Sequence, residues 1–375
     1  MTELKKNIDY HSTMRKLATS YPVLNEVIIN IVFWVISFVL MSVIIFFARH
    51  SIIAAFQISV HLKLWPYVLD SAIMGIMFGG IMGVVDYYFH KKIFQDISVG
   101  KIILLKAILS LVILLLVFII RRYVLFNLVE APVIHNERQM NSSIIWIELF
   151  EIMLIYTAFM SVVLSFMKEV NKKFGPGILV PLLLGQYRKP KEQERIFMFM
   201  DLKSSTSIAE TIGHSKYSSF IRDAFIDINK VLADYNAEVY QYVGDEIVIS
   251  WRTEEGLKDA ACVNFFFACE KQLKSRERYY KEQYGMVPSF KASLHIGKVI
   301  AVEIGEVKRD IAYHGDTLNT ASRIQSMCNE FHKKLLVSDA MVETGILDNK
   351  FKTEHLGNVI LKGKTIPVGI ISIES

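Results

Sequence analysis

Two aspartates in the second half of the chain follow segments that are typical of buried strands. Asp201 comes directly after the apolar run 196–200, and Asp245 lies in a Gly-Asp pair between two strand-like segments within residues 239–251. A strand that stops at an acid, together with a hairpin that carries an acid at its tip, can bring two carboxylates together. Hard oxygen ligands of this kind suit Mg²⁺, which keeps its remaining positions for water and phosphate. Each aspartate alone would be interpreted as an ordinary turn residue, so the predicted metal site depends on the pair.

Polar residues that could act on a phosphate lie further downstream. Within the stretch 315–323, Asn319 and Arg323 stand four residues apart and share one face of a predicted helix. An amide and a guanidinium on one face suit a ribose or phosphate oxygen and a developing negative charge. Near the end of the chain, Lys362 is followed by Gly363, which would let the backbone approach a ligand, although such a turn alone is a weak signal. The sequence has no Walker-type glycine loop, which excludes a P-loop enzyme.

An α+β domain is predicted to position these residues. The patterning predicts, in this order, a strand at 196–200, a long amphipathic helix over 208–232, a hairpin within 239–251, a helix over 256–284, strands at 290–304 and 310–314, and a helix over 316–328. This is the β-α-β-β-α-β order of a ferredoxin-like sheet, with additions. Because a fold does not determine a function, the functional prediction depends on the site residues.

The first half of the chain is predicted to be an all-α, four-helix transmembrane domain. Hydrophobic residues make up 52% of the 375 residues, which is high for a soluble protein of this size. Four apolar segments each have about the ~20 residues that a bilayer requires: 27–48, 65–85, 102–120 and 144–166. Basic clusters that include Lys5, Lys91 and Lys168 flank one side, so the positive-inside rule predicts a multi-pass protein of the inner cell membrane with both termini in the cytoplasm.

The second apolar segment carries glycines at every fourth position, Gly75, Gly79 and Gly83. One face of this helix is therefore bare enough for a neighbouring backbone to approach closely. Packing within the helix bundle and contact between two copies of the chain are both compatible with this pattern.

Acidic residues within the predicted spans are expected to pair with arginines at the outer side. The acids are Asp70, Glu148 and Glu151, and the bases are Arg121 and Arg122. Intramembrane acids are costly and are usually paired, so salt bridging is the expected role, with a ligand or ion sensor as the alternative.

The predicted domain boundaries follow from these patterns. They are a cytoplasmic segment 1–26, a transmembrane domain 27–167, a connector 168–194 in which Gly-Pro-Gly at 175–177 ends the last membrane helix, and a catalytic domain 195–375. The net charge of +5 is modest and its basic residues lie beside the apolar segments, which favours a lipid bilayer and excludes nucleic acid as a partner. Three cysteines without metal-type spacing indicate a reducing compartment.

Four stretches of the C-terminal half, in this order and spacing, resemble the class III nucleotidyl cyclases. They are Asp201 before a Ser/Thr cluster, Gly244-Asp245 in a hairpin, the Gly-Asp-Thr-Leu-Asn-Thr-Ala-Ser-Arg stretch 315–323, and Leu361-Lys362-Gly363-Lys364. The resemblance covers about residues 195–375, and the stretch 315–323 is its most specific part.

The resemblance implies a role for each matching residue. Asp201, Asp245 and the backbone carbonyl of Leu202 would hold two Mg²⁺ ions, with Mn²⁺ as a substitute, for an in-line displacement that releases pyrophosphate. Arg323 would stabilise the transition state and Asn319 would orient the ribose. Lys362 would bind the terminal phosphates. In this family the metal acids and the Asn/Arg pair come from different protomers, so an obligatory homodimer with two composite sites is implied.

The positions that select the base depart from the family pattern. Adenylate cyclases usually have Lys four residues before the second metal aspartate and guanylate cyclases have Glu, whereas this chain has Gln241. The partner position is often Asp or Thr for ATP and Cys for GTP, whereas this chain has Ala312. A glutamine can offer either its carbonyl or its amide group to a purine. We expect ATP as the substrate, because the Glu/Cys signature for GTP is absent, and GTP is the alternative.

Two other interpretations remain open. The segment Val243-Gly244-Asp245-Glu246-Ile247 is similar to the hairpin motif of diguanylate cyclases, although only one glycine precedes Asp245 and that family has no counterpart of Asn319, Arg323 and Lys362. A non-catalytic membrane receptor with a cyclase-like domain is the second alternative. The unusual base-selecting pair favours it mildly, and the presence of both metal acids argues against it.

Overall fold

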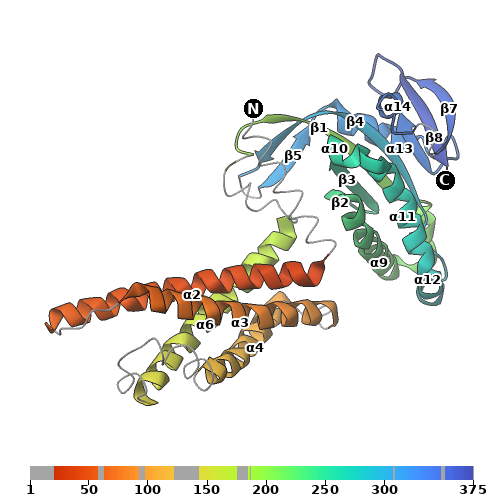
Figure 1. Ribbon diagram of the computed structural model, residues 1–375. Helices are drawn as coiled ribbons and strands as arrows, with labels where there is room; N and C mark the ends of the chain where they lie inside the picture. The colour runs from red at the N-terminus through yellow and green to blue at the C-terminus, as the bar shows by residue number, and fades with distance from the viewer. Residues whose placement is uncertain are drawn as a thin grey trace. The chain divides into compact units, whose positions relative to one another are not determined.

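The computed structural model describes residues 21–57, 63–92, 98–121, 143–174, 185, 187–306, 309–347 and 351–374 (Figure 1). The chain forms two compact units, Met1–Pro176 and Gly177–Ser375. Most of the predicted segment 1–26 and part of the predicted connector 168–194 lie outside the described residues.

Four long helices make up the described part of the N-terminal unit: α2 (Pro22–Ala55), α3 (Leu64–Lys92), α4 (Val99–Ile120) and α6 (Ser143–Phe174). Each contains a segment long and apolar enough to cross a membrane. Large apolar side chains such as Ile36 and Ile155 are exposed on these helices, as expected for surfaces that face hydrocarbon. Each predicted span coincides with one helix, and α6 ends directly before the Gly-Pro-Gly sequence, as predicted.

The glycine face of α3 packs against α2. A Cβ atom added at Gly75 would lie 2.5 Å from Val35 Cα, and one added at Gly83 would lie 2.5 Å from Val27 Cα. Real Cβ atoms do not come so close to a backbone, so the glycines allow the two helices to approach. Of the two interpretations of the glycine pattern, the structure supports packing within the bundle, because α2 already covers this face.

Arg121, directly after α4, pairs with Asp70 of α3. Its Nε and Nη2 atoms donate to the two carboxylate oxygens of Asp70 at 2.8 and 2.6 Å. The expected salt bridge is therefore confirmed for this pair, and a bidentate guanidinium supplies the compensation that an intramembrane acid needs. Glu148 and Glu151 are exposed on α6, and Arg122 lies outside the described residues.

A second ionic cluster, which we did not predict from the sequence, joins all four helices of the N-terminal unit. Lys168 Nζ of α6 lies 2.6 Å from Asp86 Oδ2 of α3 and 2.7 Å from Glu26 Oε2 of α2. Lys106 Nζ of α4 lies 3.2 Å from Asp86 Oδ1. Because two acids meet two lysines, the charges balance within the cluster. Asp86 and Lys106 are buried, so the pairing of their charges offsets the cost of removing them from water.

The C-terminal unit is built on one mixed sheet. Its strands are β1 (Lys191–Leu202), β2 (Glu238–Val243), β3 (Glu246–Arg252), β4 (Phe290–Ile304), β5 (Asp310–His314), β6 (Leu335–Ser338), β7 (Lys352–Val359) and β8 (Val368–Glu374). The strand order is β2-β3-β1-β4-β6-β8-β7, and β5 pairs with β4. The first four strands have the order of the predicted ferredoxin-like core, with β1 antiparallel to both β3 and β4.

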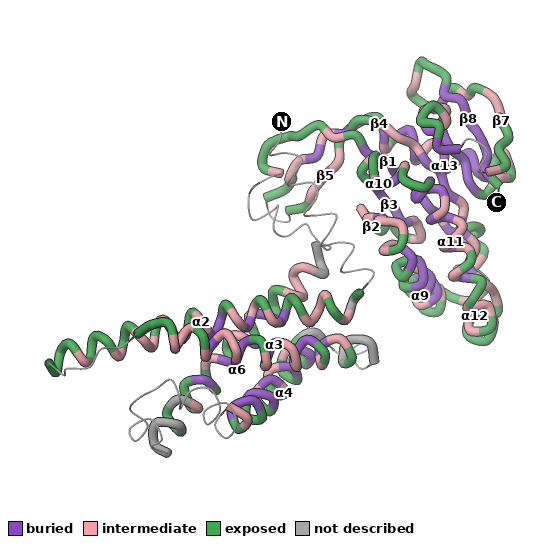
Figure 2. The backbone as a smooth tube through the Cα atoms, in the orientation of Figure 1, coloured by how far each residue is buried: buried purple, intermediate pink, exposed green. Residues whose placement is uncertain are grey.

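The two faces of the sheet pack against different helices. Alternate residues of β1, such as Ile196 and Met198, enter the main core beneath the helices α9 (His214–Leu232) and α11 (Ala261–Ser275). Phe197 and Phe199 lie on the opposite face, beneath the helix α13 (Asp316–Ser326). Figure 2 shows the buried residues that run along β1, β3 and β8. Asp201 has the same strand alternation as Phe199, so it lies on the α13 face and not in the main core.

The helices of the C-terminal unit are shorter than predicted. They are α8 (Ser205–Ile212), α9 (His214–Leu232), α10 (Thr253–Leu257), α11 (Ala261–Ser275), α12 (Glu277–Tyr284), α13 (Asp316–Ser326) and α14 (Asp339–Val342), with short 3₁₀ turns at Ala233–Tyr235 and Lys258–Ala260. The single helix predicted over 208–232 is interrupted at Gly213, whose φ of +80° is left-handed. The helix predicted over 256–284 is interrupted where Asp259 and Ala260 have positive φ angles.

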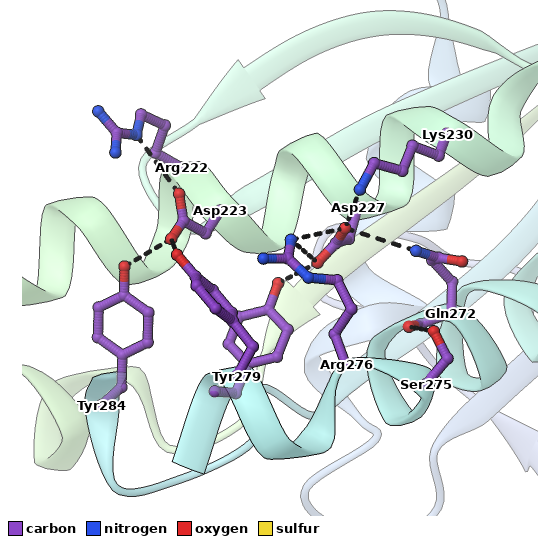
Figure 3. Close-up of polar contacts among 10 residues, drawn as sticks. Arg222, Asp223, Asp227, Lys230, Gln272, Ser275, Arg276, Tyr279 and Tyr284 are labelled. Atoms are coloured by element: carbon purple, nitrogen blue, oxygen red, sulfur yellow. Dashed lines mark hydrogen bonds and ion pairs between the residues drawn. The ribbon is translucent and has the colours of Figure 1, made fainter. Parts of the chain in front are cut away.

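Two acids of α9 hold the helices α11 and α12 through a polar cluster (Figure 3). Asp223 accepts hydrogen bonds of 2.6 Å from the hydroxyls of Tyr279 and Tyr284. Asp227 is 0% exposed and accepts bonds from Arg276 Nη1 and from the Tyr280 hydroxyl. Burial would raise the pKa of Asp227, but the bonds from Lys230, Tyr280 and Arg276 lower it. The cluster therefore fixes α9, which lies between Asp201 and Asp245 in the sequence.

Replacing Asp86 by Ala should destabilise the N-terminal unit. The substitution removes the acid that Lys106 and Lys168 share, and a buried charge without its partner costs on the order of 3 kcal/mol. The resistance of the detergent-solubilised chain to unfolding by SDS measures the effect. Glu148→Gln, at an exposed position of α6, is the matched control. Equal resistance of the two variants would contradict the structural role of the cluster.

Replacing Asp227 by Ala should loosen α9. Tyr280 loses its buried acceptor, at a cost of about 2 kcal/mol, because an unsatisfied buried donor keeps its desolvation penalty. Amide hydrogen exchange of the full chain measures the effect directly, and the amides of α9 should exchange about 30-fold faster if exchange follows local opening. Asp234→Ala, at an exposed position directly after α9, should leave the exchange unchanged.

Candidate active site

Asp201 lies near the end of β1 in a row of charged residues across the sheet. It pairs with Glu246 of β3 on one side and with Lys291 of β4 on the other. Asp245 precedes β3 at the tip of the hairpin, directly after Gly244, whose φ of +63° makes the turn. The predicted convergence of the two acids is found: burial raises the pKa of Asp201, and the charge of Asp245 raises it further.

These residues fit a divalent cation. Burial raises the pKa of Glu246 to about 7, and the nearby charges of Asp201 and Asp245 contribute to the shift. Acidic groups thus gather in a half-buried place where a cation would be stabilised. In the described part of the chain no group of three or more His, Cys, Asp or Glu residues is arranged as a metal site. The predicted donor set of two aspartates and a main-chain oxygen does not need such a group, and it stays a prediction. Leu202 can offer only its main-chain oxygen, because its hydrocarbon side chain, which is buried in the core, has no donor atom.

Two residues that contact Asp201 were not predicted from the sequence as part of the site. Lys291 Nζ lies 3.2 Å from Asp201 Oδ2, and Gln325 Nε2 of α13 donates to the same oxygen at 3.1 Å. Lys291 could be found only from the register of β1 with β4. Gln325 is 124 residues away from Asp201 and has no local signal that links it to a metal site.

Asn319 and Arg323 lie on α13 with the predicted spacing of one helical turn. Asn319 is exposed and Arg323 is half-buried. The helix is held on β4 by two hydrogen bonds: Thr317 Oγ1 donates to the Lys298 carbonyl at 2.8 Å, and Ser293 Oγ donates to the Ala321 carbonyl at 2.7 Å. The sheet therefore fixes the backbone of the helix that carries the amide and the guanidinium.

The turn that carries Lys362 lies against α13. Gly363 has a φ of +74°, and a Cβ atom at this position would lie 3.5 Å from Arg323 Nη2. Lys364 Nζ contacts Asp316 Oδ2, at the start of α13, at 2.7 Å. The structure thus brings the Lys362 turn and Arg323 together, as expected for groups that act on one triphosphate, and it leaves the Lys362 side chain exposed.

The two positions that are predicted to select the base lie on β2 and β5. Gln241 is exposed and Ala312 is buried. Their neighbours are in contact: the Tyr313 amide donates to the Tyr240 hydroxyl at 3.3 Å, and the two rings lie 5.1 Å apart. The two tyrosines therefore link the strands that carry positions 241 and 312.

Comparisons with known proteins agree with this geometry. Residues 188–371 match the family model of the adenylate and guanylate cyclase catalytic domain. Adenylate cyclase 2 of Rhizobium meliloti (strain 1021) is 32% identical over 220 residues, which cover 59% of this chain and 61% of the relative. Adenylate cyclase 1 of the same organism is 23% identical over 186 residues, which cover 48% of this chain and 27% of that relative.

A solved structure supports the fold. A bacterial light-regulated adenylyl cyclase superimposes with a TM-score of 0.50 at 15% identity, over 60% of this chain and 65% of the other. At this identity the likeness shows the fold alone, which agrees with the predicted fold class. Residues 188–371 of this chain therefore belong to the adenylate and guanylate cyclase catalytic domain family, the class III nucleotidyl cyclases, and they follow four helices apolar enough to span a membrane.

Proposed function

We propose that the protein is a membrane-bound adenylate cyclase that converts ATP to 3′,5′-cyclic AMP and pyrophosphate in a homodimer. The observation that carries the proposal is the contact of Arg323 with the Lys362–Gly363 turn. This proximity supports a joint role for the Lys362 turn and Arg323, because two cationic groups near each other suit a triphosphate and its reacting phosphorus.

Each residue of the proposed site has a separate role in the reaction. Asp201, Asp245 and the Leu202 carbonyl would hold two Mg²⁺ or Mn²⁺ ions, which supply a lowered pKa for the ribose hydroxyl and charge neutralisation for the phosphates. Asn319 orients the ribose and Arg323 offsets the charge that accumulates at the α-phosphate. Lys362, on an exposed turn, binds the terminal phosphates.

Exposed apolar side chains support a homodimer. Tyr242 and Val243 are 46% and 50% exposed beside the metal-bearing hairpin tip, and Ile360 and Ile366 are 65% and 75% exposed on either side of Lys362. Apolar groups exposed beside both halves of a site suit burial against a second copy. A dimer that buries them would join the metal acids of one subunit to Asn319 and Arg323 of the other.

ATP is the proposed substrate, and GTP is the second candidate. Two relatives of this chain are named adenylate cyclases, and Gln241 and Ala312 lack the Glu/Cys signature for GTP. The family match disfavours a diguanylate cyclase, because it is to the adenylate and guanylate cyclase domain. The gathering of Asp201, Asp245 and Glu246 argues against a non-catalytic receptor. The mutual repulsion of these charges costs free energy, and a bound cation of a catalytic site would remove that cost.

The full chain in membrane vesicles should convert ATP to cyclic AMP when Mg²⁺ or Mn²⁺ is present. Mass spectrometry of the products identifies the reaction. Arg323→Ala should lower kcat by about 10²–10³-fold, because the transition state loses a preorganised donor. Cyclic GMP formed from GTP in preference would reassign the substrate, and a dinucleotide product would support a diguanylate cyclase. The absence of any product would favour the non-catalytic alternative.

Mixing two inactive variants should restore activity if the site is shared. Full-length Asp201→Ala and Arg323→Ala chains, co-expressed with different tags, form heterodimers that contain one intact composite site. Random pairing should give about a quarter of the wild-type activity, since half of the dimers are mixed and each has one of two sites. Asp201→Ala mixed with Asp245→Ala is the matched control and should stay inactive, because both variants lack the metal half. Failure of the first mixture would contradict a shared site.

A further inference from the structure

Gln325 lies on the same helix as Arg323 but points to a different part of the molecule. The two residues are two positions apart, which corresponds to about 200° around a helix. Arg323 lies against Gly363, whereas Gln325 is 6% exposed and donates to Asp201 Oδ2 at 3.1 Å. One side of α13 thus serves the phosphate-binding turn, and the other side contacts a metal acid of the same subunit.

The contact of Gln325 determines which oxygen of Asp201 is available to a cation. Lys291 Nζ also contacts Asp201 Oδ2, at 3.2 Å. The same ammonium donates a hydrogen bond to Asn329 Oδ1 at 3.1 Å, which limits its movement. Among the described residues both donors engage Oδ2, so Oδ1 is the oxygen left to a cation. A carboxylate whose second oxygen is held in this way has a fixed orientation, and such outer contacts strongly affect metal affinity.

The helix that carries Gln325, and with it the contact to Asp201, is held rigidly on the sheet. Ser293 and Thr317 fix the helix to β4 through the hydrogen bonds described above, and Ala321 and Ile324 of α13 are 0% exposed. A packed helix of 11 residues moves as a unit, so Gln325 and Arg323 keep a constant relation to each other.

We propose that Gln325 is a positioning residue for the metal site and that each α13 helix serves both active sites of the dimer. Arg323 acts in one composite site, while Gln325 of the same subunit orients Asp201 for the other. The second part of this inference rests on the shared-site homodimer proposed above. The first part concerns a contact within one subunit and can be tested separately.

A heterodimer with a single active site distinguishes the two roles of α13. One full-length subunit carries Arg323→Ala and supplies the metal acids, and the other carries Asp201→Ala and supplies Arg323. Gln325→Met in the first subunit should raise the Mg²⁺ concentration for half-maximal activity by about tenfold. The same substitution in the second subunit should leave it unchanged, because no Asp201 is present there for Gln325 to hold. The two dimers have the same composition, so a general loss of stability would affect both.

Cation binding without nucleotide provides a readout that does not depend on turnover. Homodimers of the full-length Arg323→Ala chain keep both metal halves, and their Mn²⁺ affinity can be measured by electron paramagnetic resonance. Adding Gln325→Met should weaken Mn²⁺ binding by about tenfold, and Ser326→Ala, at the exposed neighbouring position, should not change it.

Each outcome of the two experiments is decisive. Equal effects of Gln325→Met in the two subunits, or no effect in either, would overturn the assignment of one helix to two sites. Unchanged Mn²⁺ affinity would overturn the positioning role. If the mixed dimer is inactive while Mn²⁺ binding weakens as expected, the positioning role stands, and the shared-site dimer, together with the inference that depends on it, is wrong.

Discussion

The close approach of like charges on neighbouring strands is the constraint on which the active site depends. The register of β1 with β3 places Asp201 directly across from Glu246, and the hairpin adds Asp245. Two carboxylates at about 4 Å repel each other by about 1 to 4 kcal/mol, depending on how much water surrounds them. The core on the opposite face holds the register against this repulsion, because Met198 and Met200 of β1 are fully buried there. Under the proposed function, a cation would bind where the fold has already brought the charges together.

The helix α13 contacts Asp201 from the face of the sheet opposite the main core. It covers the sheet face that carries Asp201. Its polar residues divide into those that we propose contact the substrate, Asn319 and Arg323, and those that anchor the helix or support Asp201. Thr317 holds the helix to β4, and Gln325 holds Asp201. Because all these contacts involve one short helix on one sheet, a small shift of α13 changes the geometry of every group it carries. The side chains that bind the helix to β4 therefore matter to the proposed chemistry as much as the residues proposed to contact the nucleotide.

The sequence predicted the parts of the structure that have local signals. The ferredoxin-like strand order, the four apolar helices and the i,i+4 spacing of Asn319 and Arg323 all follow from patterns within short segments. The additional strands β6, β7 and β8 were not predicted, and β1 is longer than expected because its charged residues from Lys191 pair with the far end of β4. The break at Gly213 was missed because glycine is tolerated within many helices, and only its backbone angle shows the interruption.

Contacts between distant segments could not be predicted in the same way. Lys291 and Gln325 belong to different elements from Asp201 and meet it only through strand register and helix packing. The same holds in the N-terminal unit, where Glu26, Asp86, Lys106 and Lys168 come from four helices and form one cluster. An acid and a lysine that are far apart in the sequence give no periodic pattern, so their pairing follows only from the bundle. The glycine face of α3 likewise left two interpretations open until its contact with α2 was known.

If positions 241 and 312 select the base, as predicted, their side chains limit how sharply the proposed site can distinguish ATP from GTP. Ala312 has no polar side-chain atom, and the Tyr313 amide is already bonded to the Tyr240 hydroxyl. Gln241 is then the side chain of the pair that can read the purine edge. One hydrogen bond contributes about 0.5–1.5 kcal/mol, which corresponds to about a 2- to 13-fold difference in affinity. Gln241 is exposed, so its amide can present either its carbonyl or its NH₂ group. A strong preference for ATP would therefore require a further group that fixes this amide, and a homodimer would bring a second subunit close enough to provide it.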